Sequence, residues 1–317
     1  MKVRVGLRVL LSPWRVLVFL GILWAPVPAS ASGFPAPGEP PPSTIGPLIT
    51  DTAVPIGQGN FSMQSLGRLN FLGGQFSPNW RRTNLHGDYY SLQLPVTFTY
   101  GPSPNVEMML IVPYQHNWAR DARLPSAPGE GAADFGGLGD TTLNVKYQFL
   151  EETALRPTCT ALLGFGFPTG HHRWLNPLNL GTDLLGNGAY TFTGGLNLSK
   201  WCRPVYLYAN LWYTVPTTAT INETHIHDRD QVTLNLAGEW VLTRQWAILV
   251  EFNSTWRGGN LVGPRSQVPP RALLGMVGGL EYNCSKNWSF AGGLSLDLAG
   301  KNTVSSYSPI LTCKYSF

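Results

Sequence analysis

The sequence predicts an all-β fold, an antiparallel transmembrane β-barrel of about 12 strands that follows a cleaved signal peptide. Three observations support this prediction. Short segments of alternating apolar and polar residues recur along the chain, the connections between them are alternately short and long, and the last segment ends on an aromatic residue, Phe317. Such alternation is typical of strands that separate lipid from a hydrated lumen.

Residues 1–31 have the pattern of a secretory signal peptide. Basic residues from Lys2 to Arg15 precede a short apolar run, and a small-residue cleavage site, Ala29-Ser30-Ala31, follows it. A helix needs about 20 residues to cross a bilayer, so this run is too short for a retained anchor. We expect cleavage after Ala31 and export to the outer membrane of a Gram-negative cell.

The composition disfavours a soluble domain. Charged residues make up 13% of the sequence, compared with about 25% in soluble domains. The formal net charge of +4 includes four basic residues of the signal peptide, so it does not indicate a nucleic-acid partner.

The stretch from residue 32 to residue 60 is rich in proline. Because proline cannot donate a backbone hydrogen bond, such a stretch does not form a central strand. Its composition predicts a disordered periplasmic extension. The alternative is a short segment tucked into the mouth of the barrel. In either case, residues 61–317 are predicted to form the barrel.

Twelve strands are predicted after this extension. In one of the clearest, Leu143, Val145 and Tyr147 alternate with Asn144 and Lys146. The predicted ranges are 61–72, 89–100, 105–118, 138–150, 157–168, 187–200, 203–216, 230–242, 244–257, 271–283, 287–298 and 306–317.

The connections support the same interpretation independently. Short turns such as 101–104 follow the even-numbered strands, whereas long loops such as 119–137 follow the odd-numbered ones. Outer-membrane barrels have short periplasmic turns and long external loops. An even strand count then places both ends of the barrel in the periplasm.

Four short motifs lie between residues 90 and 215. They are Leu94-Pro95-Val96-Thr97-Phe98-Thr99-Tyr100-Gly101, Val112-Pro113-Tyr114, Gly137-Leu138-Gly139-Asp140-Thr141-Thr142-Leu143 and Phe167-Pro168-Thr169-Gly170. The Gly-Leu-Gly-Asp and Pro-Thr-Gly motifs together resemble an outer-membrane transporter family named after the meta-pathway of phenol degradation. The resemblance implies a transport barrel but not phenol as its substrate. The motif also has a structural interpretation, in which Asp140 caps a turn at the external rim.

Side-chain parity places charged and aromatic residues on the inner face of the predicted strands. A barrel of this size needs its lumen filled or wetted. Carboxylates that face basic residues predict a polar network, which either packs the lumen or lines a narrow path. The lumen-lining candidates are Arg68, Glu107, Lys146, Tyr206, Tyr208, Glu239, Glu251, Glu281, Asp297 and Lys314.

All four cysteines map near the periplasmic rim of the predicted barrel. The periplasm is oxidising, and an even cysteine count in an exported chain favours disulfides. Four cysteines can pair in three ways. Pairing between neighbouring strands predicts one of these, with the bonds Cys159–Cys202 and Cys284–Cys313.

Two other chemistries are weighed against transport. Outer-membrane phospholipases resemble this chain in strand number, but His116 has no accompanying serine motif. His225 and His227 could hold a divalent metal in an external loop, although a solvated loop explains them as well. We therefore predict no catalytic residues, no metal site and no cofactor.

The sequence thus predicts a monomeric outer-membrane channel or transporter for small molecules, hydrophobic or aromatic ones among them. The alternative is a non-transporting structural or surface-interaction barrel with a packed lumen. The expected partners are outer-membrane lipid, a barrel-insertion machinery that reads Phe317, and a small-molecule substrate that the sequence does not identify.

Overall fold

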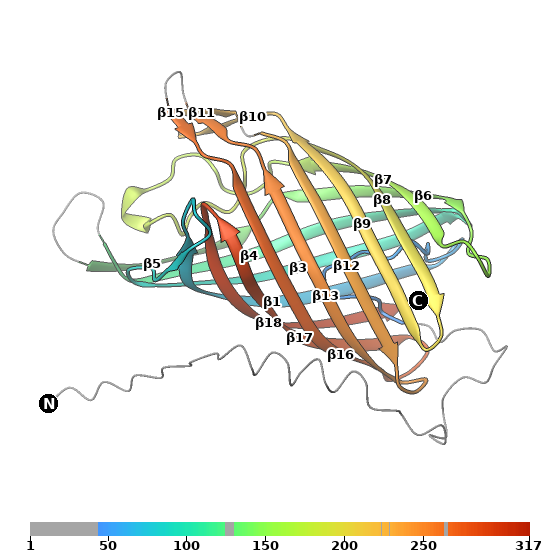
Figure 1. Cartoon of the computed structure of the whole chain (residues 1–317). Helices are drawn as coiled ribbons and strands as arrows, with labels where there is room; N and C mark the ends of the chain where they lie inside the picture. The colour runs from blue at the N-terminus through green and yellow to red at the C-terminus, as the bar shows by residue number, and fades with distance from the viewer. Residues whose placement is uncertain (1–43, 124–129, 223, 228, 263–265) are drawn as a thin grey trace, which may run out of the picture.

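A computed structural model describes residues 44–317 except 124–129, 223, 228 and 263–265. Twelve long antiparallel strands form a closed barrel, in which each strand pairs with the next and β18 pairs with β1 (Figure 1). These strands are β1 (Phe61–Phe76), β3 (Asp88–Ser103), β4 (Val106–Arg123), β6 (Thr141–Leu150), β7 (Thr158–Phe167), β8 (Thr191–Cys202), β9 (Val205–Pro216), β12 (Gln231–Val241), β13 (Trp246–Arg257), β16 (Arg271–Asn283), β17 (Trp288–Lys301) and β18 (Thr303–Ser316).

The twelve predicted strands correspond one to one with these twelve. No helix in the described part of the chain is long and apolar enough to cross a membrane. The predicted signal peptide lies outside the described residues.

The two faces of the barrel wall differ as the alternation requires. Leu236, Phe252 and Leu280 are about half exposed, at 48%, 52% and 52%, whereas their inward neighbours Glu251 and Glu281 are fully buried. The exposed apolar band faces lipid, and the buried polar residues face the lumen. This is the architecture of an outer-membrane barrel.

The last residue helps to close the barrel. Phe317 donates its backbone N–H to the carbonyl of Phe61 at 2.9 Å, and their rings lie 5.1 Å apart. Trp288, Tyr315 and Phe317 contact one another in turn at this end of the barrel. They form part of the aromatic girdle expected at a membrane interface.

Long loops and short turns gather at opposite ends of the barrel, with the C-terminus at the short-turn end (Figure 1). Several predicted loops contain strands, because pairing satisfies their backbone groups. These additional elements are β2 (Arg82–Thr83), β5 (Glu130–Leu138), which extends the wall beside β4, the 3₁₀ helix η2 (Pro177–Asn179), and a separate sheet of β10 (Thr218–Ile221), β11 (Thr224–His227), β14 (Asn260–Val262) and β15 (Ser266–Val268).

The predicted disulfides are wrong, because all four cysteines are free in the structure. Cys159 pairs in register with Leu198, so Cys202 lies four residues farther along the neighbouring strand, about 13 Å away. A disulfide requires Cα atoms about 4.4–6.8 Å apart. Cys313 is paired with Phe290 on β17, whereas Cys284 lies in the turn between β16 and β17, where its N–H donates to the carbonyl of Trp288 at 3.0 Å. Cys284 and Cys313 are therefore two strand spacings apart, about 10 Å. Cys159 and Cys202 do lie on neighbouring strands, but their register separates the sulfur atoms.

The orientation of the barrel can be tested with two exposed positions. Leu155 lies in the turn between β6 and β7 with 93% exposure, and Trp174 lies in the loop between β7 and β8 with 87% exposure. In a background with the four native cysteines replaced by alanine, Trp174→Cys should react with a membrane-impermeant maleimide on intact cells. Leu155→Cys should react only after lysis. The reverse labelling pattern would contradict the proposed orientation.

Candidate functional site

The short-turn half of the lumen is filled by residues 44–57, which we call the plug. The plug lies inside the barrel because its backbone donates hydrogen bonds to inward-facing side chains on several strands. Ile45 binds Glu281 on β16, Ala53 binds Ser199 on β8, and Ile56 binds Glu107 on β4. The expected disorder of the extension therefore does not hold for residues 44–60. Residues 32–43 lie outside the described residues.

The plug is most densely bonded at Glu251. The carboxylate oxygens of this residue accept the backbone N–H groups of Leu48 at 2.6 Å, Ile49 at 3.1 Å and Thr50 at 2.7 Å. The Thr50 hydroxyl donates a further hydrogen bond at 2.8 Å. Three successive amides that converge on one carboxylate form an anion-binding concavity. Glu251 is fully buried, so these donors replace water as its partners.

A second anchor forms around Lys146, whose side chain is buried. Its ammonium group lies 2.7 Å from Glu107 Oε1 and 3.1 Å from Asp51 Oδ1, and it donates to the carbonyl of Thr52 at 3.0 Å. Asp51 Oδ2 accepts from Asn197 Nδ2 at 2.9 Å. The buried cation is therefore paired and hydrogen-bonded, as a buried charge must be.

Four inward asparagines lie in one row across β8, β9, β12 and β13. Asn197 pairs in register with Asn210, Asn210 with Asn235, and Asn235 with Asn253. Asn210 both accepts from the Asp51 N–H and donates to the Asp51 carbonyl, each at 2.8 Å. The plug thus occupies the first two asparagines of the row and leaves the other two to the open part of the lumen.

Apolar contacts complete the docking of the plug. Ile45 and Leu48 pack in a buried cluster with Leu249, Val277, Ala291 and Ile310 of the wall. A Cβ atom at Gly293 would lie 2.8 Å from Leu48 Cδ1, so glycine at this position lets the leucine approach the backbone of the wall. Burial of two such aliphatic side chains contributes about 1.5–3 kcal/mol each.

Most of the predicted lumen residues either contact the plug or line the open part of the lumen. Glu107, Lys146, Glu251 and Glu281 contact the plug directly, and so does Glu239, which binds the Thr44 side chain. Tyr208 donates to Glu239 Oε2 at 2.8 Å, and its ring lies 6.0 Å from that of Tyr206. The positive charge of Lys314 interacts with Glu281. Arg68 and Asp297 lie apart from the plug and line the open part of the lumen.

The sequence analysis gave a segment tucked into the barrel mouth only as the alternative to a disordered extension, and it did not predict the contacts of the plug. It expected basic side chains to counter Glu251, whereas the plug backbone does so. It also omitted Asp51, which was assigned to the disordered extension but pairs with Lys146. The signal in the sequence was the group of aliphatic residues Ile45, Leu48 and Ile49 within an otherwise Pro-rich stretch.

The loop half of the lumen contains a cavity of about 430 Å³, and Ile49 of the plug contributes to its lining. Hydroxyl and amide side chains from β6, β8, β9, β12 and β13 make up most of the wall. Trp212, Leu162 and Leu273 add apolar surface, and Arg68 and Asp297 are its charged residues.

The two motifs of the sequence resemblance meet at the loop end of the barrel. Asp140 Oδ1 accepts the N–H of Gly170 at 3.0 Å, and Asp140 Oδ2 accepts that of Asn187 at 2.6 Å. The Thr169 hydroxyl donates to the carbonyl of Gly139 at 2.8 Å. Asp140 therefore ties down both ends of the loop between β7 and β8, which is a structural role.

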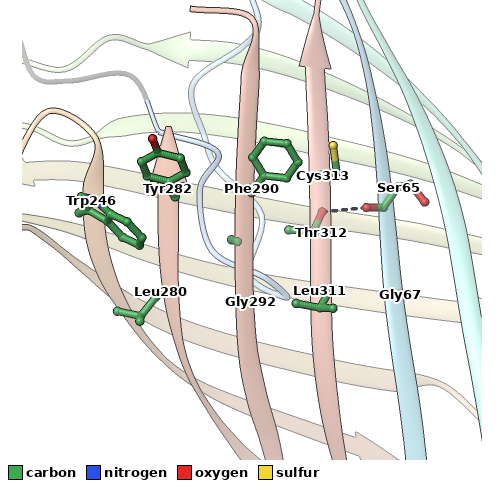
Figure 2. A pocket seen from close by; sticks show the side chains of 11 residues that line it. Ser65, Gly67, Trp246, Leu280, Tyr282, Phe290, Gly292, Leu311, Thr312 and Cys313 are labelled. Atoms are coloured by element: carbon green, nitrogen blue, oxygen red, sulfur yellow. Dashed lines mark hydrogen bonds between the residues drawn. The ribbon is translucent and has the colours of Figure 1, made fainter. Parts of the chain in front are cut away.

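A second hollow, of about 470 Å³, lies on the wall near the short-turn end (Figure 2). Trp246, Tyr282 and Phe290 border it, and Gly292 leaves its floor without a side chain (Figure 2). Leu311, at its edge, is 72% exposed on the lipid-facing surface. We assign this hollow to the aromatic band that contacts lipid.

The histidines considered as alternatives have local partners. His116 Nε2 lies 3.2 Å from Asp134 Oδ2, and within the described residues this is its only hydrogen-bond partner. On β11, His225 and His227 contact the hydroxyl groups of Thr220 and Thr218. The part of the chain that the structure describes has no group of three or more potential metal ligands.

A family model described as "Putative MetA-pathway of phenol degradation" matches residues 99–309. The chain belongs to this family. The match extends well beyond residue 215, the end of the stretch in which the sequence resemblance lies, and includes the strands that hold the plug.

Three solved structures are similar to this chain to different degrees, and the first of them shares its fold. The COG4313 outer membrane channel from Pseudomonas putida F1 is similar at a TM-score of 0.70 and 13% identity, over 83% of this chain and 97% of that chain. The transport unit of the autotransporter AIDA-I from Escherichia coli has a TM-score of 0.46 and 14% identity, over 82% and 91%. The CymD monoaromatic hydrocarbon channel has a TM-score of 0.42 and 10% identity, over 88% and 95%.

The role of Glu251 in holding the plug is testable. Glu251→Gln replaces one accepting oxygen with an NH₂ group and removes the charge, so buried N–H donors lose their partner. Hydrogen bonds to charged groups contribute about 1.5–3 kcal/mol each. Because such bonds are lost, we expect the plug to open at least about tenfold more often. Hydrogen exchange at Leu48, Ile49 and Thr50 should accelerate by that factor.

The matched control is Glu152→Gln, which removes a carboxylate paired with Lys200 at 3.3 Å in a turn outside the lumen. Exposed ion pairs contribute little, so this variant should exchange like the parent protein. Unchanged exchange at Leu48–Thr50 in Glu251→Gln would show that the carboxylate does not hold the plug.

Proposed function

We propose that this protein is an outer-membrane channel for small molecules, hydrophobic or aromatic ones among them, and that the plug closes it at rest. The observation that carries this proposal is the division of the lumen. A cavity of about 430 Å³ occupies the loop half, whereas a chain segment that is not part of the wall fills the other half. Passage then requires the plug to shift or leave.

The arrangement of hydrogen bonds supports a removable plug. The barrel is closed by pairing of β1 with β18, and the plug belongs to no sheet. Its bonds run from its backbone to side chains such as Glu251 and Ser199. The plug can therefore detach without breaking the strand ladder, and water entering the lumen would satisfy the released carboxylates.

The cavity lining supports small and largely uncharged cargo. Hydroxyl and amide groups line it together with Trp212, Leu162 and Leu273. Ligand sites typically combine apolar surface with a few convergent polar groups in this way. The family description, which concerns phenol degradation, agrees with aromatic cargo. The proposal includes no catalytic step, since His116 contacts Asp134 but no serine hydroxyl among the described residues.

The alternative function is a non-transporting barrel with a permanently packed lumen. It is favoured by the buried network around Lys146, in which each charge has a partner. The two functions differ in one respect that can be measured, namely whether removal of the plug opens a path through a barrel that remains folded.

Deletion of residues 44–57 should open the channel. In planar bilayers we expect the full chain to conduct weakly and the deletion variant to show a stable conductance several times larger, because half of the lumen is emptied. A control lacking residues 32–43 retains the plug and should behave like the full chain. Heat-modifiable migration in mild detergent verifies that each barrel is folded. A folded deletion variant that conducts no better than the parent would favour the packed barrel.

A further inference from the structure

Two arginines lie directly opposite each other at the loop end of the lumen. Arg257 is the last residue of β13, Arg271 is the first residue of β16, and the two are paired in register. The Cα atoms of such partners are about 4.5–5.5 Å apart, and like charges in this position repel each other. Within the described residues, neither arginine takes part in an ion pair. An anion between the two guanidinium groups would remove this repulsion.

Both arginine side chains belong to the inner face of the wall. Thr255 and Leu273 line the cavity in the loop half of the lumen, and each lies two residues from one of the arginines on the same strand. Side chains two residues apart in a strand share a face. Arg271 is exposed and Arg257 is half-buried. The two cations therefore lie at the mouth of the cavity, where a solute can contact them.

We infer that Arg257 and Arg271 form a binding site for the carboxylate of a small organic acid, whose uncharged body occupies the adjoining cavity. The inference rests on the proposed channel function, of which such an acid would be a cargo. A guanidinium group presents parallel N–H donors that match the two oxygens of a carboxylate, so arginine suits this ligand better than lysine would.

Gln231 holds one of the two guanidinium groups in place. Arg257 donates from Nε and Nη2 to Gln231 Oε1 at 3.1 and 2.7 Å. Gln231 in turn donates from Nε2 to Thr233 Oγ1 at 3.1 Å. Within the part of the chain that the structure describes, these bonds leave Nη1 of Arg257 and the guanidinium group of Arg271 for a ligand.

Two rows of inward side chains connect the arginines to the cavity. Pairing in register across β9, β12, β13 and β16 defines both rows. The row at the mouth contains Gln231, Arg257 and Arg271, and the next row contains Trp212, Thr255 and Leu273. The rows are two residues apart along each strand, about 7 Å. A carboxylate in the first row therefore places an organic body of about this length beside Trp212 and Leu273, which supply apolar surface.

Charges deeper in the cavity offset each other, whereas those at the mouth add. Arg68 and Asp297 are the charged residues of the cavity lining, and they attract each other. Asp297 is paired with Gly275, which lies four residues from Arg271 on β16, about 13 Å along the strand. Because the Debye length is about 8 Å at 0.15 M salt, Asp297 is largely screened from an anion at the mouth. The carboxylate therefore binds at Arg257 and Arg271.

Titration calorimetry on the full chain in a neutral detergent tests this site with three probes. 4-Methylbenzoate has the carboxylate, 4-methylbenzyl alcohol has the same shape without the charge, and inorganic phosphate has charge without an organic body. After correction for partition into protein-free micelles, 4-methylbenzoate should bind saturably, and its affinity should fall as salt is added. The other two probes should bind at least tenfold more weakly.

Two variants assign this preference to the arginines. Arg257→Gln and Arg271→Gln should each weaken binding of 4-methylbenzoate about tenfold, because each removes a charged donor group, and neither should change the affinity for the alcohol. The matched control is Lys301→Gln, which removes the same charge at the same end of the wall. Lys301 is in register with Ala272 and therefore faces away from the arginines, so this variant should bind like the parent. Arg271→Gln alters an exposed side chain and remains informative if Arg257→Gln does not fold.

Three results would overturn the inference. They are equal binding of 4-methylbenzoate and the alcohol, phosphate binding as tight as that of 4-methylbenzoate, and unchanged affinity in both folded arginine variants or an equal loss in Lys301→Gln. Binding in detergent does not require the plug to move, so it is independent of conductance. If the variant lacking residues 44–57 conducts and the parent does not bind 4-methylbenzoate, the site is wrong and the channel function stands. If the parent binds this probe and the deletion variant does not conduct, the site stands and the channel function is contradicted.

Discussion

The capture of Glu251 by three successive backbone amides is the interaction on which the closed state of this barrel depends. A buried carboxylate without partners is costly, and so are buried amide donors without acceptors. The Glu251 carboxylate and the plug amides therefore satisfy one another as long as the plug is inside the barrel. At other points of the wall, Glu281 and Glu107 likewise accept backbone N–H groups of the plug, and Lys146 donates to Asp51 of the plug. The plug is thus held by polar complementarity, with a small apolar cluster around Leu48 in addition.

The strand register determines where this complementarity can form. Because side chains alternate, one row of inward positions crosses β8, β9, β12 and β13 as four asparagines. Two of them hold the plug through Asp51, and the other two border the cavity. The plug contacts and the cavity lining are therefore adjacent parts of one surface. A shift of the plug would expose more of the same amide-lined wall to a molecule in the cavity.

The barrel was predictable from the sequence because its signal is local. Alternation in β6 and β12, and the lengths of the turns, depend on neighbouring residues alone. Contacts between distant segments were less accessible. The inward positions of Leu249 and Val277 break the polar-inside rule, since they pack against a segment about 200 residues earlier in the chain. The disulfide prediction is wrong for a related reason, since strand register depends on distant contacts. Cys159 pairs with Leu198, and Cys202 lies four residues farther along β8, so its sulfur is out of reach.

A reversible tether between plug and wall tests the account most directly. Ala53 N–H donates to Ser199 Oγ at 2.8 Å, so cysteines at these two positions lie close enough for a disulfide to be attempted. In a background without the native cysteines, Ala53→Cys/Ser199→Cys should conduct less than its single-cysteine parents when oxidised, and should recover their conductance when a reductant is added in the bilayer chamber. An oxidised protein, verified as cross-linked by mass spectrometry, that conducts as well as the reduced one would contradict closure by the plug.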